Sequence, residues 1–161
     1  MPRGETAMTL PDFPVAGGCP CGAVRYRLLA PPLSVYACHC RDCQRSSGAF
    51  ELSMPVRRSD FEHMAGDVAS FDKIADSGRV VRMHRCAACG CKLWNAPFAF
   101  PELLVLKPGS LDDPRWIAPI GNIWTDRRLP WVAIDLRLVN FPRQPPDRQP
   151  LYDAWARYAS R

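Results

Sequence analysis

Apolar and polar residues alternate along several short segments of the chain, and prolines or glycines separate these segments. In residues 22–28 the apolar Val24, Tyr26 and Leu28 alternate with Arg25 and Arg27. A period of two is typical of a strand with one buried face. The same reasoning predicts further short strands at residues 33–37, 49–54, 68–71, 80–84, 103–106 and 132–136.

Helical periodicity is confined to the end of the chain. Leu151, Trp155 and Tyr158 have the spacing of one helix face, and they follow prolines at positions 145, 146 and 150. Residues 42–47 can make one further helical turn. Because the chain contains 17 prolines, long helices are disfavoured. The pattern therefore predicts a mainly β fold with a short C-terminal helix.

Length and hydropathy indicate a single soluble domain. The 161 residues suffice for one hydrophobic core. The longest aliphatic run, residues 103–106, is too short to cross a bilayer, and residues 1–15 contain no apolar segment typical of a signal peptide. We therefore expect a cytoplasmic protein that does not contact a membrane. In a reducing cytosol stable disulfides are rare.

The net charge of +5 comes mostly from arginine, because Lys73, Lys92 and Lys107 are the only lysines among 21 basic residues. The arginines are scattered along the chain. Scattered arginines favour a solvated surface, or attraction of a small carboxylate-bearing ligand, over a nucleic-acid-binding patch.

The eight cysteines are concentrated in short clusters rather than spread along the chain. Cysteines two residues apart in an extended segment are too close to form an unstrained disulfide. In a reducing compartment, clustered cysteines indicate metal binding or redox chemistry. The clusters are Cys19-Pro-Cys21, Cys38-His-Cys40-Arg-Asp-Cys43 and Cys86-Ala-Ala-Cys89, with Cys91 two residues beyond the last.

Two of the clusters have the form of half-sites. Cys19 and Cys21 form one pair, Cys86 and Cys89 form another, and a glycine follows each pair. Glycine permits the positive φ that lets backbone amides point at thiolates. Two such pairs usually build one tetrahedral zinc site, in which sulfurs converge to within about 4 Å. Because four ligands leave no room for a substrate, we expect this site to be structural and its metal to contribute to folding.

The third cluster offers only three ligands, Cys38, Cys40 and Cys43. Three protein ligands with one open position are the arrangement of catalytic zinc, which could receive a thiol or a water molecule. Either His39 or Cys91 could instead fill the fourth position and make the site structural. The side chain of His39 is expected to point away, because it lies between two ligands in an extended register.

Other interpretations of the cysteines and histidines remain open. The three cysteines could share ligands with the first site in another pairing. A thiol–disulfide exchanger is a further alternative, although its motif requires a βαβ context that this chain does not offer. His63 and His84 are expected to be ordinary surface or core residues, with a supporting role near Cys86 possible for His84.

The cysteine motifs, taken together, resemble those of the glutathione-dependent formaldehyde-activating enzyme (GFA) family, also called the centromere protein V/GFA domain. The resemblance covers about residues 17–131. The motifs that carry it are Gly18-Cys19-Pro20-Cys21-Gly22-Ala23-Val24, Cys38-His39-Cys40-Arg41-Asp42-Cys43-Gln44-Arg45-Ser46-Ser47-Gly48 and Cys86-Ala-Ala-Cys89-Gly90.

The resemblance implies a β-tent fold of packed, short antiparallel β-sheets with zinc knuckles, and two zinc sites. By position, the four-cysteine site would be structural and Cys38, Cys40 and Cys43 would form the substrate-side site. We expect residues 1–14 to be a disordered leader, residues 15–144 the GFA-like domain and residues 145–161 a C-terminal helical tail.

The reaction implied by the resemblance joins formaldehyde and glutathione to give S-hydroxymethylglutathione, or runs in reverse as a carbon–sulfur lyase. The expected partners are therefore a small thiol such as glutathione and a small aldehyde. Arg45 is the candidate for binding an anionic group of the substrate, with a surface ion pair as its alternative role. The alternative function is a zinc-stabilised module that binds a protein or nucleic acid without catalysis.

Overall fold

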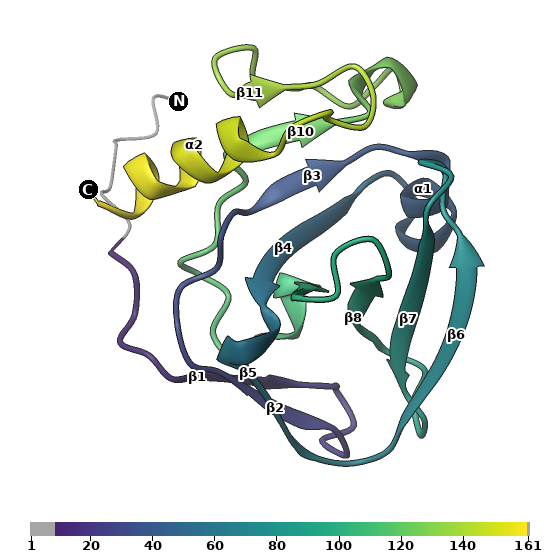
Figure 1. Ribbon diagram of the computed structural model, residues 1–161, viewed down its shortest axis with the longest axis vertical. Coiled ribbons are helices and arrows are strands. Elements are labelled where there is room, and N and C mark those ends of the chain that lie inside the picture. The colour runs from purple at the N-terminus through teal and green to yellow at the C-terminus, as the bar shows by residue number, and fades with distance from the viewer. Residues whose placement is uncertain (1–8, 161) are drawn as a thin grey trace.

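A computed structural model of the protein describes residues 9–160, and within them eleven strands form two sheets (Figure 1). The smaller sheet has the order β1-β2-β5 and the larger has the order β11-β10-β3-β4-β9-β8-β7-β6. The prediction of a mainly β fold is therefore confirmed. The strands are β1 (Val15–Gly18), β2 (Arg25–Leu28), β3 (Tyr36–Cys38), β4 (Glu51–Arg57), β5 (Phe61–Ala65), β6 (Val68–Ile74), β7 (Val80–Cys86), β8 (Lys92–Pro97), β9 (Leu103–Leu106), β10 (Gly121–Ile123) and β11 (Val139–Asn140).

Helices are few and short among the described residues. Helix α1 spans Arg41–Ser47, helix α2 spans Gln149–Ala159, and single 3-10 turns lie at Arg58–Asp60, Pro108–Ser110 and Thr125–Arg127. Leu151 and Trp155 of α2 are buried, which confirms the helix predicted from their spacing. Helix α2 lies beside β10 and β3 (Figure 1), where Leu151 fills the space above Gly121.

The alternating pattern and the observed burial agree in β2, where Tyr26 and Leu28 are fully buried and Arg27 is exposed. Strand β4 differs because Ser53, Met54, Pro55 and Val56 are all buried. A strand that is covered on both faces has no period of two.

Most strand pairs are antiparallel, but β10 pairs in parallel with both β3 and β11. Its register sets Asn122 opposite Ala37 and Ile123 opposite Cys38. Segments that are about 85 residues apart in sequence are thereby joined beside the second cysteine cluster, and this pairing positions the candidate site.

One predicted strand is wrong. Residues 132–135 have no regular structure and residues 136–137 form a turn. The carboxylate of Asp135 accepts a hydrogen bond from the backbone N–H of Arg137, and its carbonyl accepts one from Leu138. This local turn diverts the chain before it can pair. Strands β1, β5, β8, β10 and β11 were not predicted from the sequence.

The first described residues extend the core without forming a strand. Residues 9–14 have no regular secondary structure, yet Leu10 and Phe13 pack against the core and Phe13 meets Trp116 edge-on. The remainder of the predicted leader, residues 1–8, lies outside the described residues.

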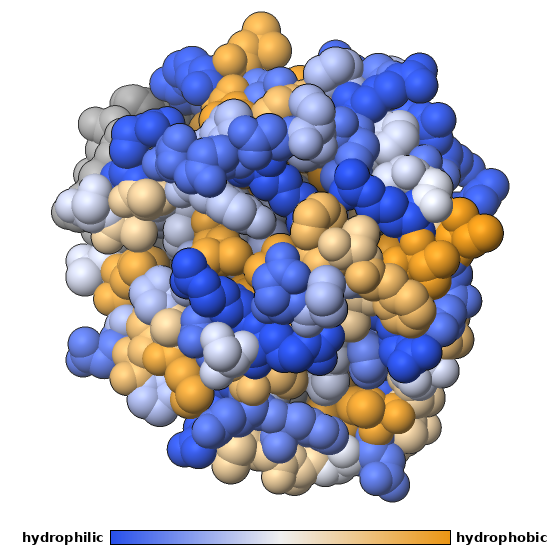
Figure 2. All heavy atoms as spheres, in the orientation of Figure 1, coloured by the Kyte–Doolittle hydropathy of each residue, from blue (hydrophilic) through white to orange (hydrophobic). Residues whose placement is uncertain are grey.

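The surface alternates polar and apolar residues, with an apolar group on the side where β6 lies (Figure 2). Phe71 and Ile74 of β6 are among the exposed large apolar residues. No helix in residues 9–160 has the length and apolar character needed to span a bilayer.

Candidate metal centres

Four cysteines from two distant turns converge at the junction of the two sheets. Cys19 and Cys21 lie in the turn between β1 and β2, while Cys86 ends β7 and Cys89 lies in the turn between β7 and β8. All four sulfurs lie within 4.8 Å of one another, with Cys21 Sγ 3.3 Å from Cys19 Sγ and 3.7 Å from Cys86 Sγ. This cluster could hold a metal ion that ties the smaller sheet to the larger one.

The two turns have the same construction. Gly22 and Gly90 adopt positive φ angles of 79° and 73°, and their N–H groups donate to the carbonyls of Cys19 and Cys86. The N–H of Val24 donates to Cys19 Sγ at 3.2 Å. This hydrogen bond lowers the pKa of the Cys19 thiol to about 6. The backbone therefore favours the thiolate that a metal requires.

The second cluster is formed where β3 leads into α1. Cys38 ends β3, Cys40 caps the N-terminus of α1, and Cys43 lies in its first turn. The three sulfurs lie within 4.8 Å of one another. We call these residues the cysteine trio. The spacing in sequence thus grouped the cysteines as the structure does.

The trio stabilises negative charge on one sulfur. The thiols of Cys38 and Cys43, followed by the backbone N–H groups of Cys43 and Asp42, hydrogen-bond to Cys40 and lower its pKa to about 2. The N–H of Cys43 lies 3.4 Å from Cys40 Sγ. The same interactions raise the pKa values of Cys38 and Cys43. Cys40 is therefore the residue of the trio that ionises most readily.

His39 does not join the trio. The ring of His39 is buried against Phe50, and Nε2 lies 3.0 Å from Asn122 Oδ1. Because Asn122 Nδ2 donates to Asn140, Oδ1 faces His39 and Nε2–H is the donor. As expected from its register, the side chain points away from the sulfurs.

Cys91 lies on the side of the four-cysteine cluster rather than beside the trio. Its thiol donates to the carbonyl of Lys92 at 3.5 Å. Burial and the neighbouring Cys89 raise the pKa of the Cys91 thiol, so it stays protonated. Among residues 9–160 neither Cys91 nor any histidine forms a metal-binding group with the trio.

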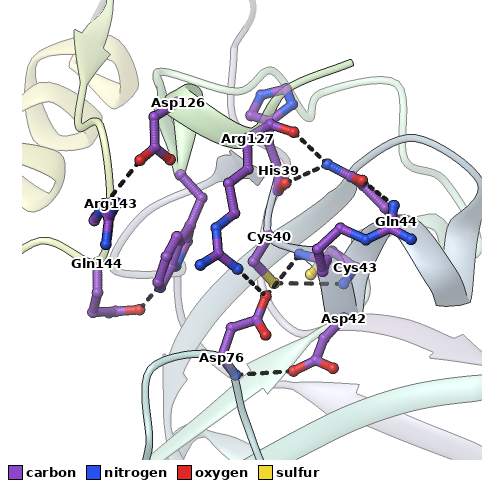
Figure 3. A network of polar contacts seen from close by, with 12 residues as sticks. His39, Cys40, Asp42, Cys43, Gln44, Asp76, Asp126, Arg127, Arg143 and Gln144 are labelled. Carbon is purple, nitrogen blue, oxygen red and sulfur yellow. Dashed lines mark hydrogen bonds and ion pairs between the residues drawn. The ribbon is translucent and has the colours of Figure 1, made fainter.

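Two aspartates that sequence reasoning did not assign to the site lie beside the trio, one in α1 and one in a neighbouring hairpin. Asp76, in the β6–β7 turn, and Asp42 form a further potential metal-binding group with Cys40. The N–H of Asp76 donates to the Asp42 carboxylate at 3.0 Å, and the Asp76 carboxylate accepts from Arg127 at 3.2 Å (Figure 3). The Asp76-Ser77-Gly78 sequence signals a turn, but nothing in it shows what the turn touches.

A buried ionic network lies directly beneath the trio. The Glu51 carboxylate accepts hydrogen bonds from Lys107 at 2.7 Å and from Lys92, and the Cys43 thiol lies 3.7 Å from it. Burial alone would raise the pKa of Glu51, but the two ammonium groups outweigh it and lower the pKa to about 2. Glu51 is therefore ionised at neutral pH.

The remaining histidines have structural roles. His63 Nε2 lies 2.9 Å from the carbonyl of Ala65, and His84 stacks on Trp94 with ring centroids 5.2 Å apart. Burial lowers the pKa of His84. Neither belongs to a metal-binding group of the described residues.

Hollows open on two sides of the trio. A cavity of about 130 Å³ is lined by all three sulfur residues together with Tyr36 and Trp124. A wider hollow of about 450 Å³ is lined by Cys40, Cys43 and Arg45. Arg45 is exposed and makes no ion pair within residues 9–160. The trio is thus accessible to a small ligand. A structural metal site, the role expected for the four-cysteine cluster, does not need such access.

Comparison with known proteins identifies the family. The family model described as "Glutathione-dependent formaldehyde-activating enzyme" matches residues 14–127. A Halomonas elongata protein named "Putative glutathione-dependent formaldehyde-activating enzyme" is 28% identical over 131 residues, which cover 75% of this chain and 81% of the relative. A crystal structure of a Rhodobacter sphaeroides protein shares the fold, with a TM-score of 0.50 and 18% identity over 78% of this chain and 98% of the other. The chain therefore belongs to the glutathione-dependent formaldehyde-activating enzyme family.

Proposed function

We propose that the protein is a zinc-dependent carbon–sulfur lyase that forms or cleaves the adduct of a small thiol, such as glutathione, with a small aldehyde, such as formaldehyde. The observation that carries the proposal is the cysteine trio, which presents three convergent sulfurs at the wall of a cavity. Membership of the family supports the choice of glutathione and formaldehyde.

The donor sets fit zinc. Zn–S bonds of about 2.3 Å in a tetrahedron require sulfurs roughly 3.8 Å apart. The sulfurs of Cys19, Cys21, Cys86 and Cys89 satisfy this within the 4.8 Å limit, as do those of the trio. We assign a structural zinc to the four-cysteine cluster. A zinc held by the trio would act as a Lewis acid that favours the thiolate form of the incoming thiol.

The residues around the trio bind and orient the reactants. In the forward direction the substrate thiolate attacks the aldehyde carbon, a C–S bond forms, and the carbonyl electron pair moves to oxygen, which takes a proton. In the reverse direction the same C–S bond breaks. Confinement in a cavity of about 130 Å³ holds the two reactants in a productive orientation.

We assign the proton donor to Tyr36. Tyr36 and Cys38 are two residues apart on β3, so they share a face, and both line the cavity. Burial raises the pKa of Tyr36, so its hydroxyl is protonated at neutral pH and can donate to the developing alkoxide. On the other side of the trio, Arg45, which forms no ion pair among residues 9–160, is suited to a carboxylate of the thiol.

Exchange NMR of labelled formaldehyde with glutathione tests the proposal. The native protein should exchange formaldehyde faster than the uncatalysed background, and Cys40→Ser should return the rate to that background. Metal analysis should give two zinc ions per native chain and one for Cys40→Ser. Identical exchange with and without the native protein would reject the assignment of glutathione and formaldehyde.

A further inference from the structure

Three residues mark the boundary between the trio's cavity and a second hollow. Arg79, Phe100 and Arg148 line the cavity of about 130 Å³ that reaches the trio. The same three residues also line a neighbouring hollow of about 300 Å³, which the trio does not reach. A molecule that extends from the trio into the second hollow therefore passes between or beside these side chains.

The two arginines sit against the same aromatic ring. The guanidinium carbon of Arg148 lies 4.7 Å from the centroid of Phe100, and that of Arg79 lies 5.2 Å from it. The side chains come from distant parts of the chain, since Arg79 precedes β7 and Arg148 caps α2. Contact with one ring fixes both guanidinium groups at the boundary.

Neither guanidinium is paired with a carboxylate in the part of the chain that the structure describes. Within residues 9–160 neither Arg79 nor Arg148 forms an ion pair with a carboxylate, although ten other basic residues do. Nη1 of Arg148 is buried and has no hydrogen-bond partner among the described residues. A buried guanidinium nitrogen ordinarily has a partner, and carboxylates are its strongest ones.

We propose that Arg79 and Arg148 form a subsite that binds a carboxylate of the substrate thiol, an inference that rests on the proposed function. The cavity at the trio and the second hollow adjoin each other at Arg79, Phe100 and Arg148. Glutathione has two carboxylates, so with its sulfur at the trio it can place one at Arg79 and Arg148 and leave the other to Arg45 in the hollow on the other side of the trio. The preferred substrate is a thiol whose carboxylate lies several bonds from sulfur.

Calorimetric titration of the zinc-loaded protein with S-methylglutathione tests the subsite without any reaction, because this ligand keeps both carboxylates and lacks a free thiol. Arg79→Ala/Arg148→Ala should bind it roughly 10- to 100-fold more weakly than the native protein, the usual effect of losing a charge-assisted hydrogen bond. Arg115→Ala is the matched control, since Arg115 is 88% exposed and does not line the cavity. Its affinity should equal that of the native protein.

Lysine variants test whether weaker binding by the alanine variants results from misfolding. Arg79→Lys and Arg148→Lys keep the charge but lose the planar fork, so they should recover part of the lost affinity. The lysine variants should also keep the zinc content and the far-ultraviolet circular dichroism of the native protein, which shows that they are folded. Equal affinity for S-methylglutathione in native and doubly substituted protein, or no binding by the native protein, would overturn the subsite.

The two proposals fail separately. If the native protein does not accelerate formaldehyde exchange but binds S-methylglutathione in an arginine-dependent way, the lyase assignment is wrong and the carboxylate subsite stands. If Cys40→Ser abolishes exchange while the arginine variants bind S-methylglutathione normally, the subsite is wrong and the lyase assignment stands.

Discussion

Replacing Glu51 with glutamine should strongly destabilise the protein, because it removes the only negative charge from the buried network beneath the trio. The Glu51 side chain is 11% exposed and those of Lys92 and Lys107 are 14% and 10% exposed. Glutamine has nearly the same shape as glutamate, so the substitution tests charge rather than packing. Two ammonium groups would be left in a poorly hydrated site.

The magnitude follows from the pKa of Glu51, which is about 2 in the folded protein against an ordinary value of 4.5. At 1.36 kcal/mol per pKa unit, this difference corresponds to roughly 3 kcal/mol of stability. Because the folded-state pKa is lowered, this stability is fully present above about pH 4.5 and is lost as the pH falls towards 2. Breaking a buried ion pair by removing one partner typically costs a similar ~3–5 kcal/mol.

Urea unfolding at pH 7, on samples matched for zinc content, measures the effect. Glu62→Gln is the control, because the Arg27–Glu62 pair has side-chain exposures of 45% and 42% and should contribute less than about 1 kcal/mol. We expect the free energy of unfolding of the Glu51 variant to fall by roughly 3 kcal/mol. Adding Lys107→Met to this variant should restore part of that loss. Equal losses for the Glu51 and Glu62 variants would refute the reasoning.

Four further substitutions have distinct expected outcomes. Cys86→Ser should lower the zinc content by one ion per chain and destabilise the protein by several kcal/mol; metal analysis showing two zinc ions would contradict this. Tyr36→Phe should slow formaldehyde exchange roughly 100-fold without changing the zinc content, and an unchanged rate would remove Tyr36 from the mechanism. Gly66→Ala would place a methyl group 2.1 Å from the carbonyl oxygen of Ala23, whereas Gly78→Ala meets no atom within 4 Å. Thermal unfolding should show that Gly66→Ala lowers the free energy of unfolding by well over 2 kcal/mol. Gly78→Ala should lower it by about 1 kcal/mol, which is the strain of positive φ alone. Equal losses would contradict the packing at Gly66.

Sequence reasoning succeeded where short-range spacing carries the information. Cysteines two or three residues apart predicted both groups of converging sulfurs, and in the four-cysteine cluster a glycine follows each pair. The alternation in β2 predicts one buried face of a strand, and the spacing of Leu151 and Trp155 predicts one buried face of a helix. Both elements are present. Such patterns depend on residues near one another in the chain, so they are readable without the fold.

Sequence reasoning failed where long-range contacts decide. Strand β8 is buried on both faces for most of its length, so it shows no alternation. The alternating segment around Val132 was diverted by the turn at Asp135. The approach of Asp76 to Cys40, and the meeting of Arg79 with Arg148 on Phe100, arise from packing of distant segments that no local pattern encodes.

The central claim is that the trio, rather than the four-cysteine cluster, receives the substrate thiol. Its most direct test is to follow the absorption spectrum of the cobalt(II)-substituted protein during titration with glutathione. The account predicts that glutathione increases the thiolate-to-cobalt absorption of the native protein and of Cys91→Ser, and that Cys40→Ser abolishes the change. A spectrum that glutathione leaves unaltered, or a change that persists in Cys40→Ser, would contradict it.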